Sequence, residues 1–186
     1  MTLRLPLSNE KKFATLVSAY GPTMTNPDEV KDKFYEDLNT VIGATPNSDK
    51  LIILGDFNAR VGCDSAAWKS VIGKHGVGKC NSIGLLLIQT CSEHDLLITN
   101  TVFRLPIRNR MPWMHPRSKY WHLIDYLIIR KGTGGTYVLL SCAGHRLIVA
   151  KLNLHIQPRE KTPRKESSIT SECQQAENRN CPEIFL

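Results

Sequence analysis

Runs and alternations of apolar residues divide the first 156 positions into short segments of regular structure. The unbroken aliphatic run at 51–54 predicts a strand that is buried on both faces. Between Val30 and Ile42 the apolar residues are spaced by four, four, three and one, which predicts an amphipathic helix that begins near Pro27 and stops near Gly43. The other expected elements are a hairpin over 2–7 and 13–20, a helix over 83–94, and strands over 96–101, 122–129, 137–140 and 146–156.

Polar residues follow the central strand at once. Gly55 lets the backbone turn, and Asp56 and Asn58 come directly after it. Because alternate residues of an extended segment point to the same side, these two side chains could reach one metal-bound phosphate. The tetrapeptide of residues 55–58 is also typical of a turn that merely closes a strand, and both interpretations are open at this point.

The strand expected over 122–129 contains one acid, Asp125, among apolar residues. A buried carboxylate is costly unless it is paired or hydrogen-bonded, so Asp125 needs a partner. His145 stands just before the last alternating strand. Taken alone, a histidine in such a place is more often a surface or capping residue than a catalytic one.

Residues 102–121 combine positive charge with aromatic rings. Such a segment can neutralise phosphates and stack on bases, although a solvated loop whose tryptophans close the edge of the domain is the alternative. The candidate nucleic-acid contacts are Arg104, Arg108, Arg110, Trp113, Met114, Arg117, Lys119, Tyr120 and Trp121.

Composition favours one domain over 1–156 followed by a basic, polar tail over 157–186 that we expect to be disordered. The 186 residues are 41% hydrophobic, with no apolar run long enough to cross a bilayer and no signal-like start, so we expect an intracellular protein, nuclear or cytoplasmic. The six cysteines lack C-x-x-C spacing and predict free thiols. The net charge of +7 favours an anionic partner, most commonly nucleic acid, although charge alone does not exclude lipid.

The motifs taken together resemble a known family. Tyr20-x-Pro after a strand, GDFN, an Ile-Asp-Tyr strand and a late His follow the order of the endonuclease/exonuclease/phosphatase superfamily. The wider segments SAYGPT, LIILGDFNARVG, HGVGKCN, WMHPRSK and HRLIVAKL resemble the endonuclease domain of RTE-type non-LTR retrotransposons and a host protein derived from it.

This resemblance implies a DNase I-like fold, in which two β-sheets form a sandwich flanked by helices. It also implies Mg²⁺-dependent hydrolysis of phosphodiester bonds in DNA. Asp56 would orient or deprotonate the attacking water, Asn58 would hold that water or a phosphate oxygen, and Tyr20 would donate to the phosphate or leaving group. His145 would contact the phosphate, with Asp125 accepting from its other ring nitrogen. Asn81 would reach the substrate.

Two positions depart from the family pattern. Relatives begin with a further half-domain that carries a metal-binding Glu, whereas this chain starts at Met1 inside the hairpin, so we expect a truncated domain with one sheet face exposed. An Asp that precedes the final His in relatives is replaced by Gly144. No metal ligand can therefore be nominated, and we expect impaired catalysis. The alternatives are a non-catalytic nucleic-acid-binding module and a retroelement relic, and a protein partner or oligomer could cover the exposed face.

Overall fold

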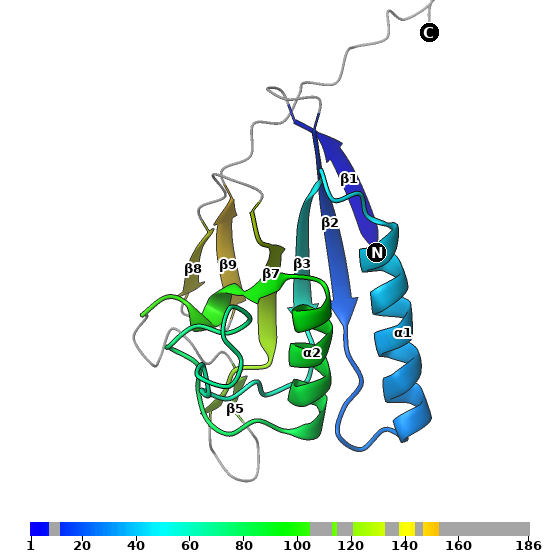
Figure 1. Cartoon of the computed structure of the whole chain (residues 1–186). Coiled ribbons are helices and arrows are strands. Elements are labelled where there is room, and N and C mark those ends of the chain that lie inside the picture. The colour runs from blue at the N-terminus through cyan, green and yellow to red at the C-terminus, as the bar shows by residue number, and fades with distance from the viewer. Residues whose placement is uncertain (8–11, 105–112, 115–120, 133–137, 144–146, 153–186) are drawn as a thin grey trace, which may run out of the picture.

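The computed structural model of the chain describes residues 1–7, 12–104, 113–114, 121–132, 138–143 and 147–152 (Figure 1). Five strands form one sheet in the order β1-β2-β3-β7-β4. Their bounds are Thr2–Pro6 for β1, Phe13–Tyr20 for β2, Lys50–Asp56 for β3, Asp125–Arg130 for β7 and Leu96–Ile98 for β4. Strands β2 and β3 are parallel, and every other pair in this sheet is antiparallel.

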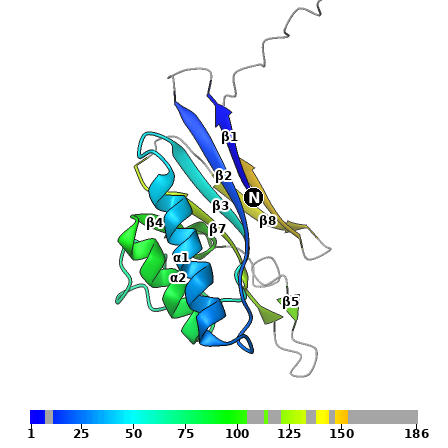
Figure 2. The ribbon, with the colours of Figure 1, turned by 90° about the vertical axis from the view of Figure 1, so that its right-hand side faces the viewer.

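Helices α1 (Asp28–Ala44) and α2 (Ser82–Glu93) cover one face of this sheet (Figure 2). The alternation of the central strand sends Leu51 and Ile53 into the core beneath the helices, where both are 1% exposed. The Tyr35 hydroxyl of α1 donates to the Ile83 carbonyl of α2 at 3.1 Å. Among the described residues, no helix is long and apolar enough to cross a bilayer.

The other face of the sheet is only partly covered. Ile52 and Leu127 are buried there, whereas Leu3 and Leu54 are 47% and 38% exposed. A hairpin of β8 (Val138–Ala143) and β9 (Leu147–Leu152) lies on the side of the sheet away from the helices (Figure 2). A second small pair joins β5 (Trp113–Met114) to β6 (Trp121–His122).

The predicted mixture of helices and strands is confirmed, as are the N-terminal hairpin, both helices and the central strand. A two-sheet sandwich is not established, because the described residues opposite the main sheet form only the two-stranded β8–β9 hairpin, so this part stays a prediction. The tail over 157–186 lies outside the described residues. Cys63, Cys80 and Cys91 are free thiols, as expected.

Two predicted strands of the main sheet are shorter than expected, while the strands expected over 137–140 and 146–156 are described as Val138–Ala143 and Leu147–Leu152. The strand expected over 96–101 ends at Ile98, and Thr99–Thr101 form a 3₁₀ turn (η1) instead. Tertiary contacts explain this, because the Asn100 side chain pairs with the backbone of β7 in place of a continued strand. The strand expected from His122 begins at Asp125, since the Leu123 and Ile124 carbonyls bond outside the ladder to the Tyr126 hydroxyl and the Phe57 N–H.

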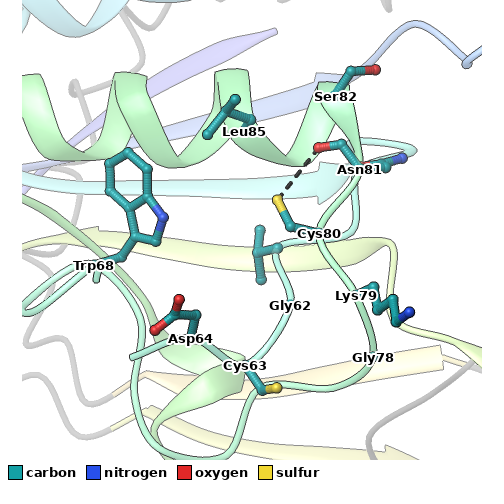
Figure 3. Close-up of a pocket in the computed structure, with 11 residues that line it drawn as sticks. Gly62, Cys63, Asp64, Trp68, Gly78, Lys79, Cys80, Asn81, Ser82 and Leu85 are labelled. Carbon is teal, nitrogen blue, oxygen red and sulfur yellow. Dashed lines mark hydrogen bonds between the residues drawn. The ribbon is translucent and has the colours of Figure 1, made fainter. Parts of the chain in front are cut away.

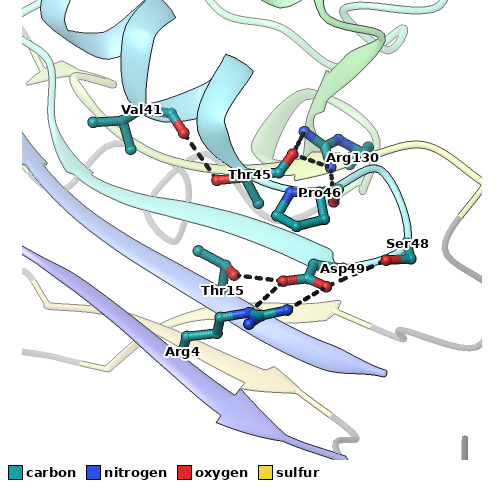
Figure 4. Close-up of polar contacts among 8 residues, drawn as sticks. All are labelled: Arg4, Thr15, Val41, Thr45, Pro46, Ser48, Asp49 and Arg130. Carbon is teal, nitrogen blue, oxygen red and sulfur yellow. Dashed lines mark hydrogen bonds and ion pairs between the residues drawn. The ribbon is translucent and has the colours of Figure 1, made fainter. Parts of the chain in front are cut away.

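The segment between α1 and β3 is held by hydrogen bonds on both sides (Figure 4). The Asp49 carboxylate, only 1% exposed, accepts from Arg4 Nε at 2.7 Å and from the Thr15 hydroxyl at 3.2 Å. On the other side, Arg130 donates to the Pro46 carbonyl at 2.7 Å. These contacts tie β1, β2 and β7 to the start of β3. They therefore help to fix the position of the whole strand, including Asp56 at its other end.

We predict that Asp49→Asn lowers the free energy of unfolding by about 1–3 kcal/mol at pH 7, because it leaves buried hydrogen bonds unmade. The Arg4 hydrogen bond lowers the pKa of Asp49 in the folded protein. The stabilisation is therefore full above the unfolded pKa of about 4 and is lost as the pH falls through the lower folded value. Urea denaturation at pH 7 and pH 3 measures both effects. Asp37→Asn, which breaks only the exposed pair with Lys33, is the control and should change little.

Candidate active site

Three neighbouring strands end with polar side chains at one level of the sheet. Tyr20 on β2 pairs in register with Asp56 on β3, and Asp56 pairs with Asp125 on β7. Directly opposed residues in an antiparallel pair have Cβ atoms about 4.5–5.5 Å apart and point to the same face. The two predicted carboxylates are therefore neighbours, and Tyr20, which is 75% exposed, stands beside them.

Two glycines allow the ends of β2 and β3 to approach closely. Gly55 has φ +151°, and a Cβ there would stand 1.8 Å from the Ala19 carbonyl oxygen. A Cβ on Gly21 would stand 2.8 Å from the Phe57 carbonyl oxygen. Any side chain at either position would push the strand ends apart, and with them Tyr20 and Asp56.

Asn58 fixes the turn that follows Asp56. Its backbone is left-handed, with φ 49°, a conformation that asparagine tolerates. Its N–H donates to Asp56 Oδ1 at 2.8 Å, and its side-chain Nδ2 donates to the Gly21 carbonyl at 2.9 Å. The prediction that residues 56–58 are extended is wrong, because β3 ends at Asp56 and local turn bonds take over. Asn58 thus orients the Asp56 carboxylate through its backbone.

Asp125 is half-buried beside a like charge. Burial, and then the charge of Asp56, raise the pKa of Asp125 to about 6. Its main chain is held by Asn100, which donates to the Asp125 carbonyl at 3.1 Å and accepts from the Leu127 N–H at 2.8 Å. The result is a carboxyl group that changes protonation near neutral pH at a fixed position.

Asn81 begins α2 as its N-cap. Its side-chain Oδ1 accepts from the Gly84 N–H at 2.8 Å and from the Arg60 N–H at 2.9 Å. Its Nδ2 lies 3.3 Å from the Met24 sulfur. The carboxamide oxygen is thus engaged within the protein, and the predicted contact with substrate stays a prediction that rests on Nδ2.

Several predicted site residues lie outside the described residues, namely Arg108, Arg110, Arg117, Lys119, Tyr120 and His145. Trp113 and Trp121 belong to β5 and β6, where Trp113 pairs with His122 and Met114 with Trp121. The proposed contact between Asp125 and His145 and the proposed DNA contacts of this basic segment are therefore still predictions.

The donors that could hold a metal ion here are the two carboxylates. In the described ranges no group of three or more His, Cys, Asp or Glu residues has the arrangement of a metal site. Mg²⁺ commonly uses one or two carboxylates and completes its octahedron with waters and substrate phosphate oxygens. The oxygen donors of Asp56 and Asp125 fit that mode of binding.

Sequence reasoning missed Asn100, which positions Asp125. The signal was the polar triplet Thr99-Asn100-Thr101 after an apolar run, which interrupts the alternation that a strand requires. At this point side chains take over the hydrogen bonds that backbone pairing with β7 would otherwise make. Thr99 Oγ1 donates to the Leu127 carbonyl at 2.9 Å, next to the two hydrogen bonds of the Asn100 side chain.

Curated proteins resemble this chain over most of its length. Craniofacial development protein 2 from Bos taurus is 35% identical over 157 residues, which are 81% of this chain and 26% of that protein. The same-named protein from Tragulus javanicus is 33% identical over 157 residues, or 81% of this chain and 27% of its own length. The chain is homologous to these proteins. It spans about a quarter of their length. No protein-family model matches the chain.

We predict that Gly55→Ala destabilises the fold by about 3 kcal/mol or more, because the new methyl group would overlap a backbone carbonyl. Gly43→Ala is the matched control: a Cβ there meets nothing within 4 Å, and the residue lies in α1. That substitution should raise the free energy of unfolding by about 0.5–1 kcal/mol. Chemical denaturation of both variants checks the pair, and equal effects would contradict the close approach.

We predict that Asp56→Asn lowers the pKa of Asp125 from about 6, because it removes the neighbouring charge while burial persists. Carboxyl-carbon NMR titration of the Asp125 side chain measures this directly. Asp32→Asn, which removes an exposed carboxylate from α1, should leave the Asp125 titration unchanged. An unshifted Asp125 in the Asp56→Asn variant would show that the two carboxylates are not neighbours.

Proposed function

We propose that this chain is a DNA-directed phosphodiesterase domain of the endonuclease type, dependent on Mg²⁺. The observation that carries the proposal is the alignment of Tyr20, Asp56 and Asp125 at one level of adjacent strands. A phosphate above this level would meet a phenol donor and two carboxylates from a rigid sheet. Homology to Craniofacial development protein 2 is compatible with the proposal but does not by itself specify an activity.

The roles follow from the two environments. Asp56, oriented by the Asn58 N–H, is placed to accept a proton from the attacking water. With no cation bound, the pKa of Asp125 is about 6, so it can exchange a proton near neutral pH; with Mg²⁺ bound it would be an ionised ligand. Tyr20 is exposed and can donate its hydroxyl hydrogen to a phosphate oxygen or to the departing oxygen. His145 enters this scheme through the family resemblance.

Mg²⁺, when bound, would polarise the phosphate and stabilise the charge that develops on its oxygens. Asp56 and Asp125 are the described residues that would hold it, together with the phosphate itself. Binding of the ion should therefore be weak without substrate, because two carboxylates leave most of the octahedron to water and phosphate. We expect a slow enzyme for the same reason.

A second function is favoured by the charge of the molecule. A net charge of +7 supports binding to DNA or RNA whether or not cleavage follows. In this alternative the domain is a non-catalytic nucleic-acid-binding module. Its affinity would fall steeply with salt and would not depend on Asp56.

The test of the phosphodiesterase is nicking of supercoiled plasmid by the purified chain, with Mg²⁺ or with EDTA. We predict Mg²⁺-dependent nicking that Asp56→Ala reduces by about 100-fold or more, the range expected for removal of a positioned base. Asp32→Ala, an acid-to-alanine change on the exposed side of α1, is the control and should nick like the wild type.

Three outcomes separate the readings. If the Asp56→Ala variant nicks plasmid at the same rate as the Asp32→Ala control, the assigned site is refuted. Folded protein that never nicks but binds DNA with a steep salt dependence would favour the binding module. Folded protein that neither nicks nor binds would contradict both proposals.

A further inference from the structure

A cavity of about 480 Å³ lies between the loop of residues 61–80 and the start of α2 (Figure 3). We propose that this cavity binds a nucleotide unit, meaning a planar base together with its phosphate. The inference rests on the proposed function in one respect, because DNA held at the carboxylate pair is one source of such a unit. The volume of the cavity is within the range of about 300–1,000 Å³ that small-molecule sites occupy.

The wall of the cavity suits a flat apolar ring. Trp68, Leu85 and Val61 line it. Trp68 is half-buried and packs on one side against the hydrophobic core, which holds its indole in place. Leu85 is 41% exposed although it lies on a core helix, so an apolar ligand would cover it. A base stacked on an indole contributes about 1–3 kcal/mol whatever its identity.

The charge around the cavity suits a phosphate. Residues 59–81 carry Arg60, Lys69, Lys74 and Lys79 against a single acid, Asp64. Within the described part of the chain, no salt bridge is formed by any of these four cations. Lys79 lines the cavity on the side opposite Trp68 (Figure 3). In Figure 3 the Lys79 side chain points away from Trp68, so its ammonium group could pair with a phosphate at the outer rim of the cavity.

The other polar groups of the cavity include one carboxylate, Asp64, and one thiol, Cys80. Asp64 Oδ1 accepts from the Ala67 N–H at 3.0 Å, so the backbone engages one of its two oxygens. Burial raises the pKa of the Cys80 thiol, which stays neutral at physiological pH and donates to the Asn81 carbonyl at 3.4 Å. The lining thus combines an apolar side with one cation, Lys79, and one acid, Asp64.

The cavity adjoins the carboxylate site through one short segment. Residues 57–61 leave the end of β3 and enter the cavity wall at Val61. The Arg60 N–H and carbonyl pair with Asn81 at 2.9 and 3.0 Å, which joins this segment to the first turn of α2. Since a Cβ on Gly84 would stand 1.9 Å from the Arg60 carbonyl oxygen, the contact is tight. A strand crossing Asp56 could place a neighbouring nucleotide in the cavity.

The experiment measures equilibrium binding in EDTA, so that no cleavage occurs. The probes are 2′-deoxyadenosine 5′-monophosphate and a single-stranded oligodeoxynucleotide. Leu85→Trp fills the cavity from an exposed helix position, and Val30→Trp makes a similar change at a 46%-exposed position of α1. Lys79→Gln removes the cation, and Lys33→Gln on α1 is its control. Thermal unfolding confirms that each variant is folded.

We expect Leu85→Trp to weaken binding about tenfold and Lys79→Gln to weaken it severalfold, while both α1 controls bind like the wild type. Loss with the oligonucleotide alone assigns the ligand to a base of a bound strand, and loss with the mononucleotide alone assigns it to a free nucleotide. The proposal is overturned if the Leu85→Trp variant binds both probes as tightly as the Val30→Trp control does.

The two proposals fail separately. Wild-type protein that does not nick plasmid, but binds either probe and loses that binding in Leu85→Trp, would refute the phosphodiesterase and retain the cavity. Wild-type protein that nicks in an Asp56-dependent way, but whose Leu85→Trp variant binds both probes normally, would refute the cavity and retain the phosphodiesterase.

Discussion

The close approach of β2 and β3 at Gly55 is the constraint on which the candidate site depends. The Ala19 carbonyl occupies the space that any side chain at residue 55 would need, so the two strands can run in register to their last residues. At the opposite end of β3, Asp49 and its partners Arg4 and Thr15 hold the same register. A slip of one residue would turn Asp56 to the helix-covered face and bury it in the core.

The register of β3 and β7 brings two like charges together, which is electrostatically unfavourable. It sets Asp56 directly opposite Asp125, and like charges in opposed positions destabilise a sheet. The pKa of Asp125 rises to about 6 as a result of burial and this neighbour. Titratable groups perturbed in this way are concentrated at functional sites, because the arrangement becomes favourable only when a cation or a proton arrives. The pair therefore supports chemistry better than it supports stability.

The two faces of the sheet have different roles in the structure. Helices α1 and α2 bury the core on one face (Figure 2). Strand alternation puts Asp56 on the other face, in line with Leu54 and Ile52. The segment after β3 joins the carboxylates to a basic loop and to the cap of α2, where Arg60 and Asn81 pair through the backbone and the carboxamide. The loop after β3 thus brings positive charge next in sequence to the strand that carries Asp56.

Local pattern in the sequence was sufficient for the helices, the N-terminal hairpin and the buried strand before Gly55, because spacing and turn residues act over a few positions. It also singled out Asp56 and Asp125 as candidates, whose proposed roles and the proposed pairing of Asp125 with His145 stay predictions. Only the tertiary structure decided that Asp56 faces Asp125, that Asn100 completes β7, and that the oxygen of Asn81 is used within the fold. These contacts join residues that are 21 to 69 positions apart, and neither periodicity nor turn chemistry reports on such distances.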